Sequence, residues 1–474
     1  MNPNRSIVVL AAGMGTRMKS SLPKMLHPML GRTLLGHVLH AAEAVEAAET
    51  LVVVGSGADQ VTAHVSGIAP GARTVMQHEQ RGTGHAVRVA LEAAPELTGS
   101  VVVLYGDTPL LRGETLTGLL DAHDAAGAAA TVLTAEVPDP TGLGRIVRDA
   151  AGRLTGIVEQ RDADAAQLAV REINSGMYVF DAALLREMLA KVSTDNDQGE
   201  EYLTDVIGLL VAAGHPVGTH TAPDVQDTLG CNDRAQLAEL RRLMQRRINT
   251  ALMVSGVTMD DPDTTWIDAT ASVAPDVTLR PNVQLCGATR IGAGAEIGPD
   301  STLRDTTVGE RAVVVRAHTD RAVVGDDCTV GPFAYLRPDA VMETGAKVGT
   351  YVEVKKSTVR EGAKVPHLSY VGDATVGRRA NVGAGTIIAN YDGVSKHHTD
   401  IGEAVFVGSN SVLIAPVTVR DGSYVAAGSA IDQDVASGAI GVARGRQRNV
   451  DGWVARKRAG TRTDEAARRA AEQG

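Results

Sequence analysis

The chain of 474 residues is poor in aromatic side chains, which make up only 3% of it. Proteins that bind single-stranded nucleic acid stack the bases on aromatic side chains, so this shortage argues against such a platform. The formal net charge of −10 also disfavours nonspecific binding to the phosphate backbone of DNA. Anionic small molecules remain possible substrates, because their binding depends on basic residues at the site rather than on the net charge of the chain.

Cysteine and long apolar runs are scarce as well. The three cysteines, Cys231, Cys286 and Cys328, are an odd number without metal-ligand spacing. They are expected to be reduced, unpaired thiols in a cytosolic protein. No apolar stretch reaches the ~18 residues of a membrane span. The apolar run at residues 7–12 is too short for a signal peptide and leads into a glycine loop.

The most informative pattern is a six-residue period in residues 266–431. Aliphatic residues stand at these steps in phased blocks: Val273, Leu279, Leu285, Ile291, Ile297, Leu303; Val324, Val330, Leu336; Val376, Val382, Ile388; Val407, Leu413, Val419, Val425, Ile431. A helix has a period of about 3.6 and a flat strand a period of 2. A period of six predicts a solenoid of short strands in about nine coils of about 18 residues. It resembles the left-handed parallel β-helix of hexapeptide-repeat acyltransferases, and this resemblance supplies the handedness.

Residues 1–232 are predicted to form an α/β, Rossmann-like domain. Apolar runs at 6–10, 50–54 and 100–104 are typical of buried parallel strands, and 84–94 has a helical pattern. The length suggests two or three domains. Apolar residues at three- and four-residue steps predict a long linker helix over 233–256. The β-helix domain is expected at 257–448, and a mobile or weakly helical tail at 449–474.

A glycine-rich turn follows the first predicted strand directly. It reads Leu-Ala-Ala-Gly-Met-Gly-Thr-Arg-Met over residues 10–18, and such turns present backbone N–H groups to phosphate. Met18 occupies the position of the third glycine of a dinucleotide fingerprint, and it also breaks the P-loop spacing. With the following Pro23-Lys24, the segment resembles the signature of sugar-1-phosphate nucleotidyltransferases.

This resemblance extends over further segments and assigns expected roles. Arg17 and Lys24 would be catalytic, holding the triphosphate and stabilising charge on the leaving group. The expected nucleotide- and sugar-binding residues are Leu10, Ala11, Ala12, Gly13, Lys24, Gln77, Gly82, Thr83, Tyr105, Gly106, Asp107, Gly144, Glu159, Asn174 and Asn232. Asp107 and Asn232 would bind Mg²⁺, a hard ion that takes few protein oxygens beside phosphate and water. Arg81 departs from the family's usual leucine.

The hexapeptide period breaks at residues 389–399, where a loop is inserted. Solenoids carry function on such insertions. With the surrounding motifs, nearly the whole chain to about Arg448 resembles one family of bifunctional bacterial enzymes. These acetylate glucosamine 1-phosphate with acetyl-CoA, and then join the N-acetylglucosamine 1-phosphate to UTP. The product, UDP-N-acetylglucosamine, feeds peptidoglycan and other envelope polymers, which implies a bacterial cytoplasm.

The resemblance also assigns the acetyltransferase residues. His367 would be the base, because imidazole titrates near neutrality. Arg337, Lys355, Tyr370 and Asn381 would bind the sugar phosphate. Acetyl-CoA would contact Ala384, Asn390, Tyr391, Ser409, Ala427 and Arg444. The family is similar to other hexapeptide acyltransferases in forming homotrimers with active sites between solenoids, and Trp453 is expected to pack over a neighbouring cofactor groove.

Two other functions fit parts of the pattern. One is a nucleotidyltransferase for another sugar, such as glucose, with a solenoid that only trimerises or regulates; retention of His367 and Arg337 argues against it. The other is a non-catalytic binding protein, since regulatory and translation-factor subunits share this domain pair. Such a protein need not keep Lys24, Asp107 and His367 together, whereas this chain keeps all three.

Overall fold

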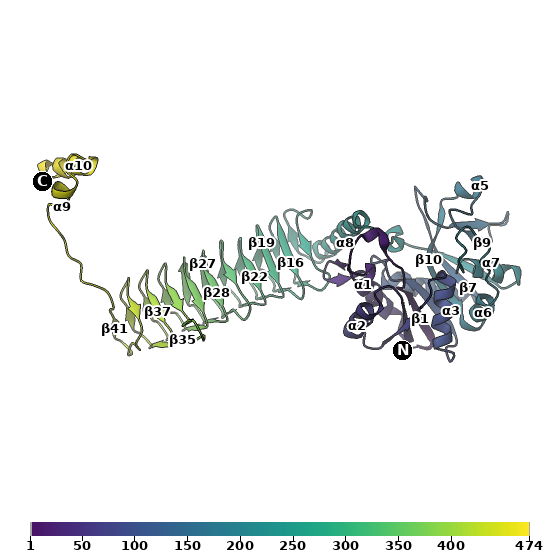
Figure 1. The fold of residues 1–474 in the computed structure, drawn as a ribbon, viewed down its shortest axis with the longest axis horizontal. Coiled ribbons are helices and arrows are strands. Elements are labelled where there is room, and N and C mark those ends of the chain that lie inside the picture. The colour runs from purple at the N-terminus through teal and green to yellow at the C-terminus, as the bar shows by residue number, and fades with distance from the viewer. Residues whose placement is uncertain (1, 474) are drawn as a thin grey trace. The chain divides into compact units, whose positions relative to one another are not determined.

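The computed structural model describes residues 2–473, which form two compact units that divide between Asp305 and Thr306. Each unit is described by itself (Figure 1). Among the described helices, none combines the length and the apolar character that a membrane crossing requires.

A mixed sheet forms the centre of the first unit. Its strand order is β11-β7-β10-β6-β1-β4-β5; β8 also pairs with β10, and β9 pairs with β8. The strands are β1 (Asn2–Leu10), β4 (Ala47–Val54), β5 (Ala72–Met76), β6 (Ser100–Tyr105), β7 (Ala130–Glu136), β8 (Arg145–Arg148), β9 (Leu154–Val158), β10 (Glu172–Asp181) and β11 (Val217–Thr221). β1 pairs in parallel with both β4 and β6, which confirms the three predicted parallel strands. Their carboxyl ends therefore meet at one edge, where ligands collect in such sheets.

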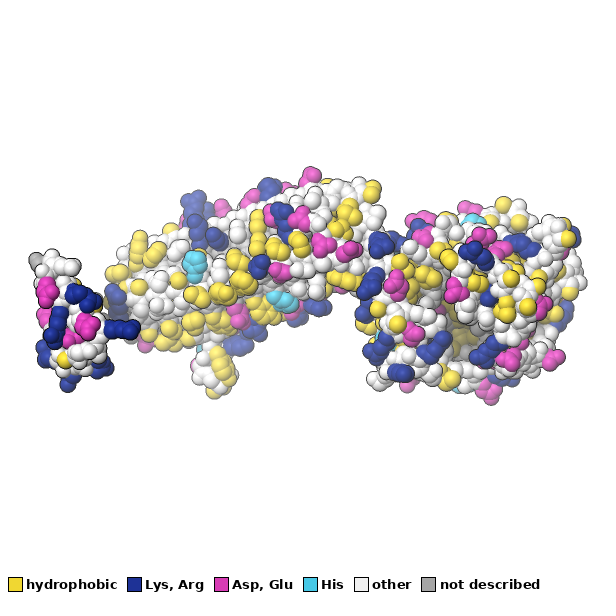
Figure 2. Space-filling view, turned by 90° about the horizontal axis from the view of Figure 1, so that it is seen from above, with side chains coloured by type: hydrophobic (Ala, Val, Ile, Leu, Met, Phe, Trp, Pro, Cys, Tyr) yellow, Lys and Arg dark blue, Asp and Glu magenta, His cyan; other side chains and the backbone are white. Residues whose placement is uncertain are grey.

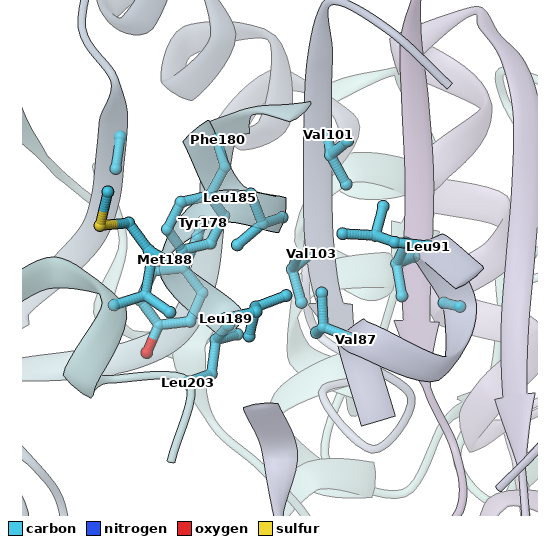
Figure 3. Close-up of a cluster of buried hydrophobic side chains, with 14 of the residues drawn as sticks. Val87, Leu91, Val101, Val103, Tyr178, Phe180, Leu185, Met188, Leu189 and Leu203 are labelled. Atoms are coloured by element: carbon cyan, nitrogen blue, oxygen red, sulfur yellow. The ribbon is translucent and has the colours of Figure 1, made fainter. Parts of the chain in front are cut away.

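Helices cover both faces of this sheet. They are α1 (Leu34–Ala42), α2 (Ala58–Ile68), α3 (Thr83–Ala93), α4 (Gly113–Ala126), α5 (Ala165–Leu168), α6 (Ala182–Leu189) and α7 (Asp205–Ala212). On one face, Val87 and Leu91 of α3 pack with Val103 of β6 and with Leu185 and Met188 of α6 (Figure 3). On the other, α1, α2 and α4 bury their leucines and valines. The predicted helix at 84–94 is α3.

The long helix α8 (Arg234–Val254) confirms the predicted linker helix. The Asp233 side chain accepts a hydrogen bond from the Gln236 N–H, which caps its first turn. Near its other end, the side-chain amides of Gln245 and Asn249 donate to the carbonyl oxygen of Thr265 at 2.8 and 2.9 Å. The helix is thereby joined to the first coil of the solenoid.

The solenoid consists of short parallel strands arranged in three sheets, the β-helix that the six-residue period predicts. Every aliphatic residue of the predicted series is buried except Val273, which is half-buried. The strands around the second site are β25 (Tyr335–Leu336), β28 (Glu353–Lys355), β30 (Lys364–His367), β31 (Tyr370–Gly372), β33 (Asn381–Val382), β34 (Ile387–Ala389), β35 (Thr399–Ile401), β36 (Phe406–Val407), β39 (Tyr424–Val425) and β41 (Ile440–Gly441).

Strand register locates the inserted loop. Glu353 pairs with Tyr370, 17 positions later, and Phe406 with Tyr424, 18 positions later. Asn381 instead pairs with Phe406, 25 positions later, so this coil carries the extra residues. After the solenoid, the tail forms two helices that contact each other, α9 (Trp453–Lys457) and α10 (Arg462–Gln473).

Candidate active sites

The glycine-rich turn packs closely against Lys24, the predicted phosphate-binding lysine. Gly15 has a φ of +59°, and a Cβ there would lie 2.6 Å from the Lys24 Cβ, so a side chain would meet both backbone strain and a clash. Gly13 has open space on its side-chain face. The turn therefore reaches the 3₁₀ helix η2 (Lys24–Leu26) closely while leaving its own backbone accessible.

Lys24, Asp107 and Asn232 meet at the carboxyl edge of the sheet. The Lys24 ammonium group donates to a carboxylate oxygen of Asp107 and, over 3.0 Å, to the amide oxygen of Asn232. The Lys24 and Asp107 side chains are only 10% and 15% exposed. Two oxygens thus converge on one cation in a sheltered place.

The same two oxygens form a donor set that suits a hard cation. An Asp carboxylate and an Asn amide are ligands that Mg²⁺ accepts while water and phosphate oxygens complete its shell. Within residues 2–473 there is no group of three or more His, Cys, Asp or Glu side chains that could hold a metal. The site therefore fits a metal ion that is bound by the two protein oxygens of Asp107 and Asn232, with other ligands from water and phosphate.

A pocket of about 340 Å³ opens above this cluster. It collects ten of the predicted residues: Leu10, Ala12, Gly13, Lys24, Gln77, Gly82, Thr83, Tyr105, Asp107 and Asn232. Ala11 is buried beneath the turn and Gly106 under the strand end. Arg17 lies exposed on the 3₁₀ helix η1 (Thr16–Met18) and does not line the pocket.

Gly144, Glu159 and Asn174 form a second group. A Cβ on Gly144 would lie 3.5 Å from both the Glu159 carboxylate and the Asn174 Cβ, so the three are neighbours. Burial raises the pKa of Glu159, and nearby Asp162 and Asp205 add to the rise, against a 3.4 Å hydrogen bond from Thr204. Burial likewise raises the pKa of Tyr105, which keeps its hydroxyl protonated.

The sequence patterns did not single out Gln80 and Glu200, which also line the pocket. The Gln80 side-chain amide donates to the Ala12 carbonyl at 2.7 Å and so closes the turn from outside. Gln77, which was predicted, donates to the His85 ring at 3.0 Å and to the Gly82 carbonyl at 3.3 Å. The only signal for Gln80 was its place three residues after Gln77.

In the solenoid, His367 is exposed at the end of β30. The next strands carry a network centred on Asp373. Asn390 donates to its carboxylate at 2.6 Å, and the Lys355 ammonium group lies 3.7 Å from it. A Cβ on Gly372 would lie 2.4 Å from the Tyr370 hydroxyl and 2.8 Å from the Asn390 amide nitrogen, which brings these two predicted residues together.

Arg337 and Asn381 lie on the same solenoid. Arg337 donates to the Glu353 carboxylate at 2.8 Å, which raises the arginine pKa. Asn381 pairs with Lys364 on one side and with Phe406 on the other. Arg337 follows β25, the neighbour of the strand that carries Lys355, whereas Asn381 lies in another sheet, on the strand next to β30 with its His367.

The inserted loop contributes a cation that sequence reasoning left without a role. Interaction between the Lys355 and Lys396 side chains lowers the pKa of Lys396 and raises that of Lys355. The inserted loop therefore brings a second amine to the Lys355 side chain. No motif marks Lys396, because its partner Lys355 lies on another coil.

Internal hydrogen bonds fix the loop that carries Lys396. The Asp392 carboxylate accepts from the backbone N–H groups of Val394 and Ser395, at 2.7 and 2.6 Å, and interacts with the His397 ring at 2.7 Å. These bonds hold the pKa of Asp392 well below its ordinary value. Tyr391 is exposed, and its hydroxyl donates to the Gly393 carbonyl.

The small residues expected to line a cofactor groove stack along one corner of the solenoid. Register places Ala384, Ser409 and Ala427 in equivalent positions on successive coils. Their carbonyls form part of the corner: Ala384 accepts from Asn410 and Ser409 from Gly428, both at 2.8 Å. Arg444 is exposed just after β41.

Comparison with known proteins covers both halves. The family described as a MobA-like NTP transferase domain matches residues 7–204, and the hexapeptide repeat of succinyl-transferase matches residues 399–433. The "Bifunctional protein GlmU" of Streptomyces avermitilis is 56% identical over 98% of this chain and 96% of its own length. The protein of the same name from Thermobifida fusca is 55% identical over 98% and 97%. The chain therefore belongs to the family of bifunctional GlmU proteins.

Proposed function

We propose that the Lys24–Asp107–Asn232 cluster catalyses uridylyl transfer and that the solenoid around His367 catalyses acetyl transfer. The chain is a bifunctional transferase of the GlmU family, which synthesises UDP-N-acetylglucosamine. The observation that carries the residue assignment is the convergence of Asp107 and Asn232 on one cation at the floor of a pocket.

In the uridylyl step, a phosphate oxygen of N-acetylglucosamine 1-phosphate attacks the α-phosphorus of UTP. The bond from the α-phosphorus to the bridging oxygen breaks, and pyrophosphate leaves. Positioning and charge neutralisation do most of this work. Lys24 neutralises phosphate charge from inside the pocket, and the open face of Gly13 lets backbone N–H groups approach the triphosphate.

Mg²⁺ is the divalent ion that we assign to the oxygens of Asp107 and Asn232, where it would neutralise phosphate charge. Arg17 is assigned to the outer part of the triphosphate, because its exposed place on η1 is adjacent to the turn. Ala11 and Gly106 support the pocket from beneath.

Gly144, Glu159 and Asn174 are assigned to the sugar. The absence of a side chain on Gly144 leaves room beside the Glu159 carboxylate, which accepts hydrogen bonds from hydroxyl groups. Gln77, held by His85 and Gly82, is assigned to the uracil edge, since a fixed amide distinguishes hydrogen-bond donors from acceptors.

In the acetyl step, the amine of glucosamine 1-phosphate attacks the thioester carbon of acetyl-CoA. The amine loses a proton to His367, the carbon–sulfur bond breaks, and CoA leaves as the thiol after taking up a proton. Lys355 and Arg337 bind the 1-phosphate, and we add Lys396 to them. Tyr370, Asn381, Asn390 and Tyr391 orient the sugar and the acetyl group.

Acetyl-CoA is assigned to the corner lined by Ala384, Ser409 and Ala427, with Arg444 at the CoA phosphates. Trp453 is assigned to a cofactor groove as well. It lies in a basic segment and its ring carries the Arg458 guanidinium at 5.1 Å. Trp453→Ala should then raise the KM for acetyl-CoA, and an unchanged KM would remove this assignment.

Hexapeptide solenoids associate, and we assign this one to a homotrimer. Large hydrophobic side chains are exposed along the solenoid, and Figure 2 shows them gathered on its surface. Leu368, directly after His367, is 60% exposed, and Val394 on the inserted loop is 89% exposed. Burial against a second copy would remove this apolar surface from water beside the acetyl-transfer site. Because its substrates are UTP and acetyl-CoA, we assign the enzyme to the cytoplasm.

One reaction tests both activities. Purified protein is mixed with glucosamine 1-phosphate, acetyl-CoA, UTP and Mg²⁺, and the products are identified by mass spectrometry. UDP-N-acetylglucosamine together with free CoA is the expected result. Acetylated sugar phosphate alone would contradict the uridylyl assignment, and no product at all would favour a regulatory protein.

A further inference from the structure

Two partly exposed arginines surround a buried carboxylate near the segments that carry Asp107 and Asn232. At the centre of this cluster is Asp227, in the 3₁₀ helix η4 (Val225–Thr228), and its side chain has no exposed surface. Arg112, the residue before α4, donates to both carboxylate oxygens at 3.0 Å, and the Thr115 hydroxyl donates to one of them. Arg247 of α8 reaches the same carboxylate at 3.2 Å.

This cluster holds both segments that carry the metal-binding oxygens. Asn232 comes five residues after Asp227, so the fixed Asp227 anchors that segment. Arg247 also donates to the carbonyl of Leu110 at 2.6 Å, three residues after Asp107. The two segments then meet directly, because the Cys231 N–H donates to the Asp107 carbonyl at 2.9 Å.

We infer that Asp227, with Arg112 and Arg247, is a positioning unit that sets the spacing of the Asp107 and Asn232 oxygens. None of the three lines the pocket, so the unit acts through backbone. Such partners of metal ligands commonly control metal affinity. The inference rests on the proposed uridylyl function and adds residues that no motif indicated.

The two-directional hydrogen bonding of Arg247 should make lysine a poor replacement for it. One guanidinium nitrogen donates a hydrogen bond to the Asp227 carboxylate, and another donates to the Leu110 carbonyl. A single ammonium group keeps the charge but cannot donate in two fixed directions at these two distances. Arg247→Lys should therefore uncouple the two segments while leaving Asp227 a cationic neighbour. Thr115→Val is a milder change, which removes one hydrogen bond to Asp227.

A matched control is available in the same unit. Arg186 of α6 donates to the carbonyls of Leu97 and Ala94, both at 2.8 Å, and touches neither metal-binding segment. Arg186→Lys should cost comparable local packing without disturbing Asp107 or Asn232. Acetyl transfer by each variant serves as an internal standard for folded, assembled enzyme.

Two measurements on the full-length protein decide the matter. The first is the Mg²⁺ concentration for half-maximal uridylyl transfer, which Arg247→Lys should raise about 10-fold, with kcat at saturating Mg²⁺ nearly unchanged. The second is amide hydrogen exchange at Cys231 without substrates, which should become at least about 10-fold faster. Thr115→Val should shift both in the same direction by less, and Arg186→Lys should shift neither.

The outcomes separate this inference from the proposed function. If wild-type enzyme makes no UDP-N-acetylglucosamine, the proposed function fails. If wild-type is active but Arg247→Lys and Thr115→Val leave both the Mg²⁺ requirement and Cys231 exchange unchanged, the positioning role is overturned. Equal shifts in Arg186→Lys would also overturn it, because the effect would then be general destabilisation.

Discussion

The ammonium nitrogen of Lys24 lies 3.0 Å from the amide oxygen of Asn232, although 208 residues separate them in the chain. Asp107 completes the contact from a third segment. Three segments that are remote in sequence therefore meet at one edge of the sheet. Lys24 lies on η2, Asp107 follows β6, and Asn232 precedes α8. The chemistry assigned to this edge leads to the first expectation.

Asp107→Ala should reduce uridylyl transfer by at least about 10³-fold, because the Lys24 ammonium group and the proposed Mg²⁺ would lose the carboxylate of the cluster. Acetyl transfer by the same preparation should stay within twofold of wild-type. Asp124→Ala, which removes only a surface ion pair with Arg5, is the control. Loss of both activities in Asp107→Ala would contradict the assignment.

His367→Ala should slow acetyl transfer about 10²- to 10⁴-fold, the usual effect of losing a general base. Uridylyl transfer, measured with N-acetylglucosamine 1-phosphate supplied directly, should remain normal. His318 is also exposed on the solenoid and packs against Tyr335, so His318→Ala controls for histidine loss. An unchanged acetylation rate in His367→Ala would refute the assignment.

Lys396→Ala should raise the KM for glucosamine 1-phosphate about 10-fold, because a charged hydrogen bond to phosphate is lost. The KM for acetyl-CoA should change much less. Lys347, exposed on the solenoid, provides the control Lys347→Ala. Steady-state kinetics with each substrate varied in turn would check this, and equal effects on both KM values would argue against phosphate contact.

Glu159→Gln should stabilise the N-terminal unit at neutral pH while weakening sugar binding. The raised pKa means that folded Glu159 holds its proton more tightly than unfolded Glu159. The native state then binds more protons, so the free energy of unfolding falls as pH rises above the ordinary value of 4.5.

Removing the charge should raise the unfolding midpoint at pH 7.5 by about 1–3 °C. At pH 4 the difference should vanish, because wild-type Glu159 is then largely neutral. Calorimetry of both proteins at the two pH values measures this. A lower midpoint for Glu159→Gln at pH 7.5 would show that the carboxylate is stabilised in the fold.

Leu368→Asp should dissociate the assembly and abolish acetyl transfer, because a charge would replace an apolar contact between copies. Uridylyl transfer should persist in the monomer. Light scattering coupled to gel filtration would measure the mass, with Leu168→Asp on α5 as an exposed leucine control. A trimer of unchanged mass and activity would place Leu368 outside the interface.

The periodic parts of the fold could be predicted because burial repeats locally. Leu279, Leu285 and Ile297 are buried as the six-residue period requires, and α8 follows its three- and four-residue steps. The assignment of Lys24 and Asp107 to one site came instead from resemblance, since no local pattern predicts a contact between segments so far apart in the chain.

The supporting residues escaped prediction for a physical reason. Asp227 has the sequence surroundings of a solvated turn, and only the folded chain brings Arg112 and Arg247 against it. The role proposed for Lys396 depends on its interaction with Lys355, which lies on an earlier coil. Gln80 acts on the Ala12 carbonyl, 68 residues away. Such roles depend on tertiary neighbours rather than on spacing.

The hydrogen bonds around Asp392 bear on how an oligomer would form. Because Val394, Ser395 and His397 are already tied to that carboxylate within one chain, the loop has its shape before any second copy arrives. Ordering a flexible segment at an interface weakens association, and a rigid one avoids that loss. Subunits should consequently dock as preformed surfaces, with fast association and little dependence on substrate.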